Sequence, residues 1–238
     1  MSESETNTKE QQKQPKVRKS ILISCAVAVA ASIIFALVVS FIPSDEDTSD
    51  QSQEYISLGM QAYLSGNYSE AISYFDQSVS LDPDDAMTYV LRGEVYYMLG
   101  EMDNALLDFS RSIQLDPDNY VYYRARGIVY YNLSEMDNAL ADFTQSITLQ
   151  PDFAHAYYWR AKVYYGLNEM DEALADLNQS IELDLDYAYA YQYRGMVCRS
   201  LGDTEQAIAD FQMCLTLNPD DEVRQEVEGY LEELGAAQ

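Results

Sequence analysis

The chain has 238 residues, of which 23% are charged and 47% are apolar, so most of it has the composition of a folded protein. Its 40 acidic residues outnumber its 14 basic residues and give a net charge of −26. Because so negative a protein repels phosphate groups, we expect no nucleic-acid partner.

The first 42 residues differ in character from the rest of the chain. Residues 1–20 carry a small positive charge, and they are followed by the uncharged run ILISCAVAVAASIIFALVVSFI at 21–42. At ~1.5 Å per residue, a helix of this length reaches ~33 Å, which is enough to cross the hydrocarbon core of a bilayer. The sequence therefore predicts a tail over 1–20, one transmembrane helix over 21–42 and a short acidic linker over 43–51.

Two other interpretations of the apolar run stay open. A cleaved signal peptide would use Ala28-Val29-Ala30 as its processing site, and a lipoprotein signal would use the LISC stretch that ends at Cys25. Both leave unexplained why the apolar region continues well beyond the processing site.

The charges on either side of the run predict its orientation. Lys16, Arg18 and Lys19 precede the run, and acidic residues follow it. The positive-inside rule then places the tail in the cytoplasm and residues 43–238 on the extracytoplasmic side. We expect a single-pass membrane protein, most simply one of the bacterial cytoplasmic membrane.

Beyond the linker, the chain repeats itself every 34 residues. EMDNAL stands at 101–106 and again at 135–140, and EMDEAL stands at 169–174. Aligned on this period, the chain divides without gaps into five units, 52–85, 86–119, 120–153, 154–187 and 188–221. Because one helical hairpin cannot bury its apolar face alone, the repetition predicts stacked hairpins that pack against one another.

Each unit predicts two antiparallel helices. In the second unit, Tyr89 and Gly93 lie on one helical face, Gly100 interrupts the helix, and Phe109 lies on the face of a second helix that Pro117 ends. Asp103 and its counterpart Asp137 either cap the second helix or lie in its first turn. Leu185 replaces the proline, so we expect a less sharply defined joint between the fourth and fifth units. Residues 222–238 predict a C-terminal capping helix.

This pattern resembles the tetratricopeptide repeat family over about 70% of the chain, since five units share the order glycine, tyrosine, alanine, phenylalanine and proline. The resemblance implies an all-α fold, a right-handed α-solenoid. It also implies a concave groove, lined by the first helix of each unit, that binds a protein or peptide partner.

Arginine and aspartate recur together in units two to five. An arginine precedes the glycine or alanine position, and an aspartate follows sixteen residues later, at an equal distance beyond the turn. The first unit has neither residue. We predict structural ion pairs across each hairpin: Arg92 with Asp108, Arg126 with Asp142, Arg160 with Asp176, and Arg194 with Asp210.

The groove that the resemblance implies contains tyrosine and basic side chains. Carried onto this chain, its candidate contacts are Tyr63, Tyr97, Arg124, Tyr131, His155, Tyr158, Lys162, Tyr165 and Arg199; the same register includes Glu94 and Gln192. We expect an apolar groove in the first two units and a basic one in units three to five. This favours a partner segment with an apolar part and an acidic or C-terminal carboxylate part, although ordinary surface charge and the family's usual tyrosines explain the same residues.

Nothing in the sequence predicts catalysis. His155 is the only histidine, and we find no phosphate-binding loop or nucleophile motif. Cys198 and Cys214 are staggered by about 12 Å along their helices, too far for a disulfide. We predict a non-enzymatic scaffold without metal, cofactor or small-molecule substrate. The alternatives are a cytosol-facing receptor or assembly factor and a self-associating structural spacer.

Overall fold

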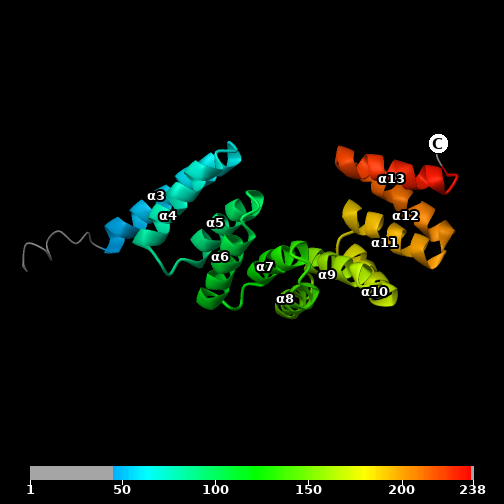
Figure 1. The fold of residues 1–238 in the computed structure, drawn as a ribbon, viewed down its shortest axis with the longest axis horizontal. Helices are drawn as coiled ribbons and strands as arrows, with labels where there is room; N and C mark the ends of the chain where they lie inside the picture. Colours follow the sequence, from blue (N-terminus) through cyan, green and yellow to red (C-terminus); the bar gives the residue numbers. More distant parts are fainter. Residues whose placement is uncertain (1–44, 237–238) are drawn as a thin grey trace, which may run out of the picture. The chain divides into compact units, whose positions relative to one another are not determined.

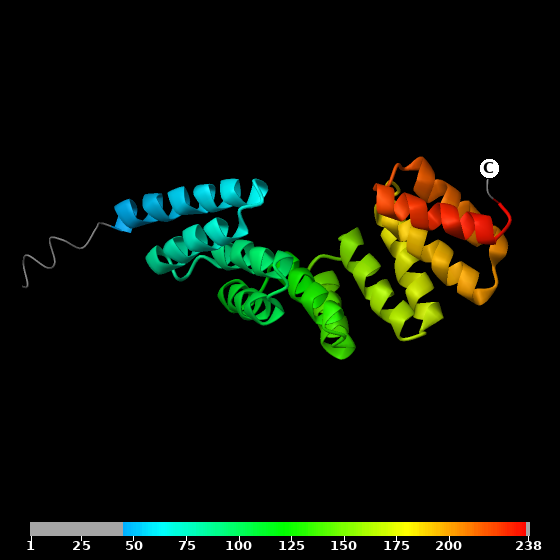
Figure 2. The ribbon, with the colours of Figure 1, turned by 45° about the horizontal axis from the view of Figure 1, so that its top comes forward.

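The computed structural model describes residues 45–236, which form eleven α-helices and contain no strand (Figures 1 and 2). The chain divides into two compact units, residues 1–51 and 52–238, and the repeats belong to the second. Within the described range, no helix is long and apolar enough to span a membrane. The predicted transmembrane segment over 21–42 lies outside that range.

The helices alternate as the 34-residue period predicts. The first helices of the five units are α3 (Asp45–Leu64), α5 (Ala86–Met98), α7 (Tyr120–Asn132), α9 (Ala154–Gly166) and α11 (Ala188–Leu201). The second helices are α4 (Tyr68–Leu81), α6 (Met102–Leu115), α8 (Met136–Leu149), α10 (Met170–Leu183) and α12 (Thr204–Thr216). A last helix, α13 (Asp221–Glu233), follows them. The all-α solenoid predicted from the repeats is confirmed.

Helix α3 starts earlier than the predicted linker allows. It begins at Asp45, so most of the segment 43–51 is helical rather than an irregular connection. The sequence between Pro43 and Gly59 contains no residue that interrupts a helix, which explains why the first helix extends past the repeat boundary.

The turn between the two helices has one backbone conformation in all five units. Gly66, Gly100 and Gly202 have positive φ, and Ser134 and Asn168 adopt the same left-handed conformation, at φ 61° and 63°. In the second unit, the amide of Glu101 donates to the Tyr96 carbonyl at 2.9 Å and closes the helix end. The turn therefore persists where glycine is absent. Asp103 and Asp137 lie in the first turn of their helices, as one of the two interpretations predicted.

The joint before the fifth unit is as well defined as the others, so the expectation of a looser joint at Leu185 is wrong. Helix α10 ends at Leu183, the same repeat position as in the preceding units. The Asp186 amide donates to Asp184 Oδ1 at 3.1 Å, as the Asp84 amide does to Asp82 at 3.2 Å. This aspartate turn ends the helix without the proline.

In the core of each unit, a small residue of the first helix packs closely against a large residue of the second helix. A Cβ atom placed on Gly127 would lie 2.8 Å from the Phe143 ring, and the other three glycines at this position face their phenylalanines at 2.6–2.9 Å. The fourth unit carries Ala161 and Leu177 instead, both fully buried. Because leucine replaces the ring, there is room for the alanine methyl group, so the two departures compensate each other.

This compensation predicts a coupled pair of substitutions. Gly127→Ala is expected to lower the free energy of unfolding by about 1–2 kcal/mol, because overpacking outweighs the better helix propensity of alanine. Adding Phe143→Leu should recover part of the loss and give a coupling energy of about 1 kcal/mol. Urea unfolding of the wild type, both single variants and the double variant measures it. Strictly additive effects would contradict the proposed contact.

Candidate functional site

Four arginines join the helices of the solenoid. In the third unit, Arg126 Nε and Nη2 each donate to an Asp142 carboxylate oxygen at 2.8 Å. The same two-bond pairing links Arg92 to Asp108, Arg160 to Asp176 and Arg194 to Asp210 at 2.7–2.8 Å. The aspartate side chains are 3–9% exposed. These pairs hold the two helices of a unit together.

Each of these arginines also reaches the preceding unit, a contact that sequence reasoning missed. Arg126 Nη1 donates to Ser110 Oγ on α6 at 3.1 Å, and Arg160 Nη1 donates to Thr144 Oγ1 on α8 at 3.3 Å. Arg92 and Arg194 reach Asp76 and Asn178 in the same way. All four acceptors are polar and stand sixteen residues before their arginine. This regular spacing in the sequence could have predicted the second contact.

A hollow of about 220 Å³ lies among the first helices of units one to three. Tyr63 of α3, Glu94 and Met98 of α5, and Arg124 and Ile128 of α7 line it, together with Tyr97, Phe109 and Ala125. Burial raises the pKa of Glu94, and the charge of Arg124 partly offsets this shift. Of the residues that line the hollow, only Glu94 and Arg124 are charged, so the hollow is mostly apolar.

Among the residues that the structure describes, Arg124 has no anionic partner at hydrogen-bonding distance. Its Nε is buried and makes no hydrogen bond to the described residues, while the guanidinium lies 5.6 Å from the centre of the Phe153 ring. Burial lowers the pKa of Arg124, and Glu94 opposes that shift. An arginine held in a partly buried position without a carboxylate is a ready binding group for an anion.

Lys162 lies in a box of four aromatic rings. Its Nζ is 4.2 Å from the centre of the Trp159 ring and 5.0–5.4 Å from those of Tyr193, Tyr131 and Tyr158. Burial lowers the pKa of Lys162 to about 8, against the opposing charge of Glu226. Like Arg124, it forms no hydrogen bond or ion pair with any other described residue.

The third predicted basic contact, Arg199, is already occupied. Its Nη1 donates to Glu233 Oε2 of α13 at 3.0 Å, and its guanidinium lies over the Tyr230 ring at 4.1 Å. A partner contact of Arg199 stays a prediction, but unlike Arg124 and Lys162 this residue has a counter-charge, which the capping helix supplies. The other basic residues beyond residue 45 all donate to protein oxygens; these are Arg92, Arg111, Arg126, Arg160, Arg194 and Arg224.

The predicted groove tyrosines that recur with the 34-residue period are half-buried in the structure; they are Tyr63, Tyr97, Tyr131 and Tyr165. The Tyr97 hydroxyl accepts a hydrogen bond from Asn132 Nδ2 of α7 at 2.9 Å, which ties two neighbouring first helices together. Tyr131 meets Trp159 edge to face, Tyr165 does the same with Tyr193, and Tyr63 packs beside Tyr68. Part of each ring remains exposed on the face that the first helices share.

The fourth unit holds the two remaining predicted contacts inside an aromatic cluster. Tyr158 is only 5% exposed, beneath Tyr187, Tyr189 and Tyr193, so it supports the surface instead of contacting a partner directly. His155 stacks between Phe153 and Tyr187 at 5.5 and 4.4 Å, and burial lowers its pKa. Within residues 45–236, no group of acidic, histidine or cysteine side chains is arranged to hold a metal.

Models of the tetratricopeptide repeat match residues 57–120 and 124–184, and a further one matches 188–221. The chain belongs to the tetratricopeptide repeat family. This family membership accounts for the 34-residue period, the helix pairs and the shared face of first helices. No curated protein matches the chain by sequence.

Several solved structures have the same fold. A MamA protein is 22% identical with a TM-score of 0.62, over 71% of this chain and 92% of its own. The repeat protein TTC0263 of Thermus thermophilus is 23% identical with a TM-score of 0.64, over 76% and 98%. YrrB, described as a tetratricopeptide repeat protein with an unusual peptide-binding site, is 19% identical with a TM-score of 0.58, over 78% and 100%. At these identities, the similarity shows the fold alone.

Proposed function

We propose that this protein is a non-enzymatic scaffold that binds an extended segment of a partner protein across the first helices of units one to four. The segment carries an apolar side chain beside an acidic group or a C-terminal carboxylate. The observation that supports this function is the pair of half-buried cations, Arg124 and Lys162, for which residues 45–236 provide no counter-charge at bonding distance. The peptide-binding site named for YrrB supports the same class of ligand.

The apolar and basic side chains of the binding face determine where the apolar and acidic parts of the partner segment lie along the solenoid. The hollow lined by Tyr63, Met98 and Ile128 accepts the apolar side chain. Arg124 borders that hollow, and Lys162 stands on the next first helix, α9, so the acidic part follows toward the C-terminal units. Charged hydrogen bonds to these two groups would give specificity and the hollow would add apolar contact area.

A selection of displayed peptides against the full-length chain tests this function. Peptides with free C-termini are expected to become enriched in acidic residues next to leucine, isoleucine or methionine. A parallel selection on the Arg124→Met, Lys162→Met variant should lose that enrichment, whereas one on Arg111→Met, which removes an exposed arginine elsewhere, should keep it. Enrichment of basic or purely apolar peptides by the wild type would contradict the proposed ligand.

The binding should also depend on pH in one direction. Because the pKa of Lys162 is lowered to about 8, its ammonium is largely present below pH 8 and lost above it. If a carboxylate requires that charge, affinity should be level below about pH 7.5 and fall up to about tenfold per pH unit above about pH 8. Anisotropy titrations between about pH 6.5 and 9.5 measure it. Lys162→Arg, which stays charged over this range, should remove the dependence.

We further propose that residues 21–42 anchor the scaffold in a membrane, with the repeats on the extracytoplasmic side, where the anchor raises the local concentration of the binding face. Protease added to cells with an opened outer envelope should then degrade the repeats; full protection would favour the cytosol-facing receptor. A self-associating spacer is the other candidate, and concentration-dependent oligomers without a peptide ligand would favour it.

A further inference from the structure

Helix α13 occupies the position of the first helix of a sixth unit. Gln192 Nε2 donates to Glu226 Oε2 at 2.7 Å and Arg199 Nη1 donates to Glu233 Oε2 at 3.0 Å, so residues 34 apart join α11 to α13. Gly229 stands at the glycine position of the repeat, 34 residues after Gly195. The helix therefore does more than cover the core. It also carries the face on which, in each complete unit, the second helix packs.

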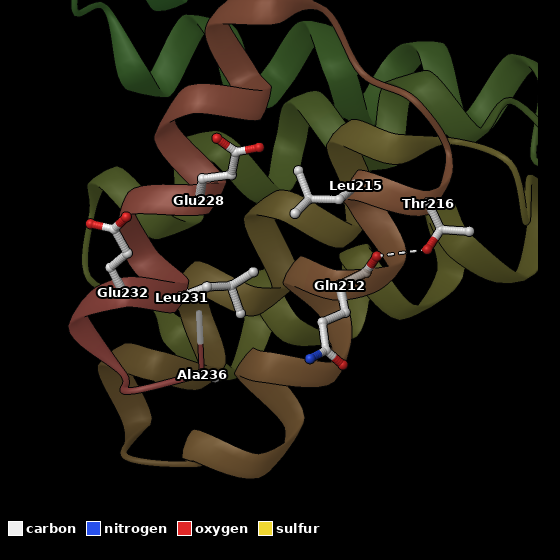
Figure 3. Close-up of a pocket in the computed structure, with 7 residues that line it drawn as sticks. All are labelled: Gln212, Leu215, Thr216, Glu228, Leu231, Glu232 and Ala236. Atoms are coloured by element: carbon white, nitrogen blue, oxygen red, sulfur yellow. Dashed lines mark hydrogen bonds between the residues drawn. The ribbon is translucent and has the colours of Figure 1, made fainter. Parts of the chain in front are cut away.

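No described helix covers that surface. In the fifth unit, a Cβ placed on Gly195 would lie 2.6 Å from the Phe211 ring of α12, whereas a Cβ on Gly229 would meet nothing within 4 Å. An open cavity of about 730 Å³ lies alongside, lined by residues of α12 and α13 and by Ala236, which follows α13 (Figure 3). The notch that receives a phenylalanine in other units is thus formed on α13 and left unfilled.

The cavity has the apolar base that a second helix needs. Leu215 of α12 and Leu231 of α13 extend into it, with Glu228 and Glu232 along its α13 side (Figure 3). One period earlier, the corresponding Ile181 and Val197 are 6% and 0% exposed, in the same core as Phe211 of α12. Leu231 is already only 6% exposed, whereas Leu215 is partly exposed, so a helix placed in the cavity would complete the burial of Leu215 as its counterpart Ile181 is buried.

The charge at this surface is reversed relative to the other units. Arg194 pairs with Asp210, the residue directly before Phe211. The paired aspartate also stands directly before a phenylalanine in units two and three, and before Leu177 in unit four. On α13 the arginine position is Glu228. A helix with aspartate before its phenylalanine would bring two carboxylates together, while one with lysine or arginine there would restore the ion pair.

We propose that α13 and α12 form a docking site for an amphipathic helix of a partner protein, one that carries a basic residue directly before a phenylalanine. The phenylalanine fills the notch at Gly229, the basic residue pairs with Glu228, and the helix completes a sixth unit. This site is separate from the binding face of Arg124 and Lys162.

Two peptides with the sequence of residues 203–217 provide a matched test, because this segment is the second helix of the fifth unit. Both carry Cys214→Ser and a fluorescent label, and one also carries Asp210→Lys. Anisotropy titrations with the full-length chain are expected to show that the lysine peptide binds at least tenfold more tightly. Phe211→Ala in that peptide should abolish the binding.

Two protein variants decide the outcome. Glu228→Arg should reverse the preference in favour of the aspartate peptide. Gly229→Leu should prevent binding of both peptides without lowering the unfolding midpoint, since nothing lies within 4 Å of its Cβ and leucine favours a helix more than glycine does. Equal affinities of the two peptides, or an unchanged preference in Glu228→Arg, would overturn the proposal. Sedimentation of the wild type as dimers that Gly229→Leu dissociates would also overturn it, by assigning the surface to a second copy of the chain.

Discussion

Arg126→Ala is expected to lower the free energy of unfolding by about 3–5 kcal/mol. The substitution removes two 2.8 Å hydrogen bonds to Asp142 and the 3.1 Å bond to Ser110 on the preceding unit. It also leaves the Asp142 carboxylate, 7% exposed, without its counter-charge. In a solenoid, each unit is stabilised mainly by its neighbours. Because Arg126 of α7 bonds to both α8 and α6, its loss weakens the third unit and also the contact of that unit with the second. Urea unfolding followed by circular dichroism measures the change.

Two controls separate this effect from general loss of charge. Arg111→Ala removes a 3.3 Å pair with the exposed Asp84 and should cost less than about 1 kcal/mol. Arg126→Met combined with Asp142→Leu removes both charges and should recover most of the stability, because no buried carboxylate is left unpaired. A loss below about 1 kcal/mol for Arg126→Ala, or a double variant no better than the single one, would show that the pair is not structural.

Arg124→Met combined with Lys162→Met is expected to weaken binding of a selected acidic peptide at least 100-fold, about 2.7 kcal/mol. Each substitution removes a charged donor from a partly buried position where a carboxylate would be desolvated, and such losses are large. The same variant should unfold at a similar denaturant concentration. It loses the contacts of Lys162 with four rings, but it also removes two partly buried cations that form no ion pair with the described residues, and the desolvation cost that this relieves offsets the loss. Isothermal titration and urea unfolding of the same preparation give both values.

A large loss of peptide affinity without a loss of stability would distinguish a binding role of these cations from a structural role. A mainly structural Lys162 would lower the unfolding midpoint when replaced, because the lost contacts with its four aromatic neighbours would then outweigh the desolvation cost that is relieved. Unchanged peptide affinity together with a clear loss of stability would refute the proposed site. Arg111→Met serves again as the control, because it also removes one positive charge but lies on α6, a second helix, outside the proposed binding face.

Some features of this protein follow from its sequence alone. The 34-residue period determined the helix pairs, and the matched spacing of Arg126 and Asp142 about their turn determined which side chains meet. Such features are predictable because identical local sequences form identical hairpins, and stacked hairpins contact mainly their neighbours.

Other features were decided only by tertiary packing. Arg124, Lys162 and Arg199 are equivalent as basic residues on one predicted face. Arg199 is paired with Glu233 of α13, whereas the other two have no such partner in the described part of the chain. Likewise, Gly229 continues the repeat in sequence, but the absence of a covering helix among residues 45–236 leaves it open. The physical reason is that the availability of a charge or a notch depends on which neighbour reaches it, and contacts from a separate helix are not encoded in the local pattern.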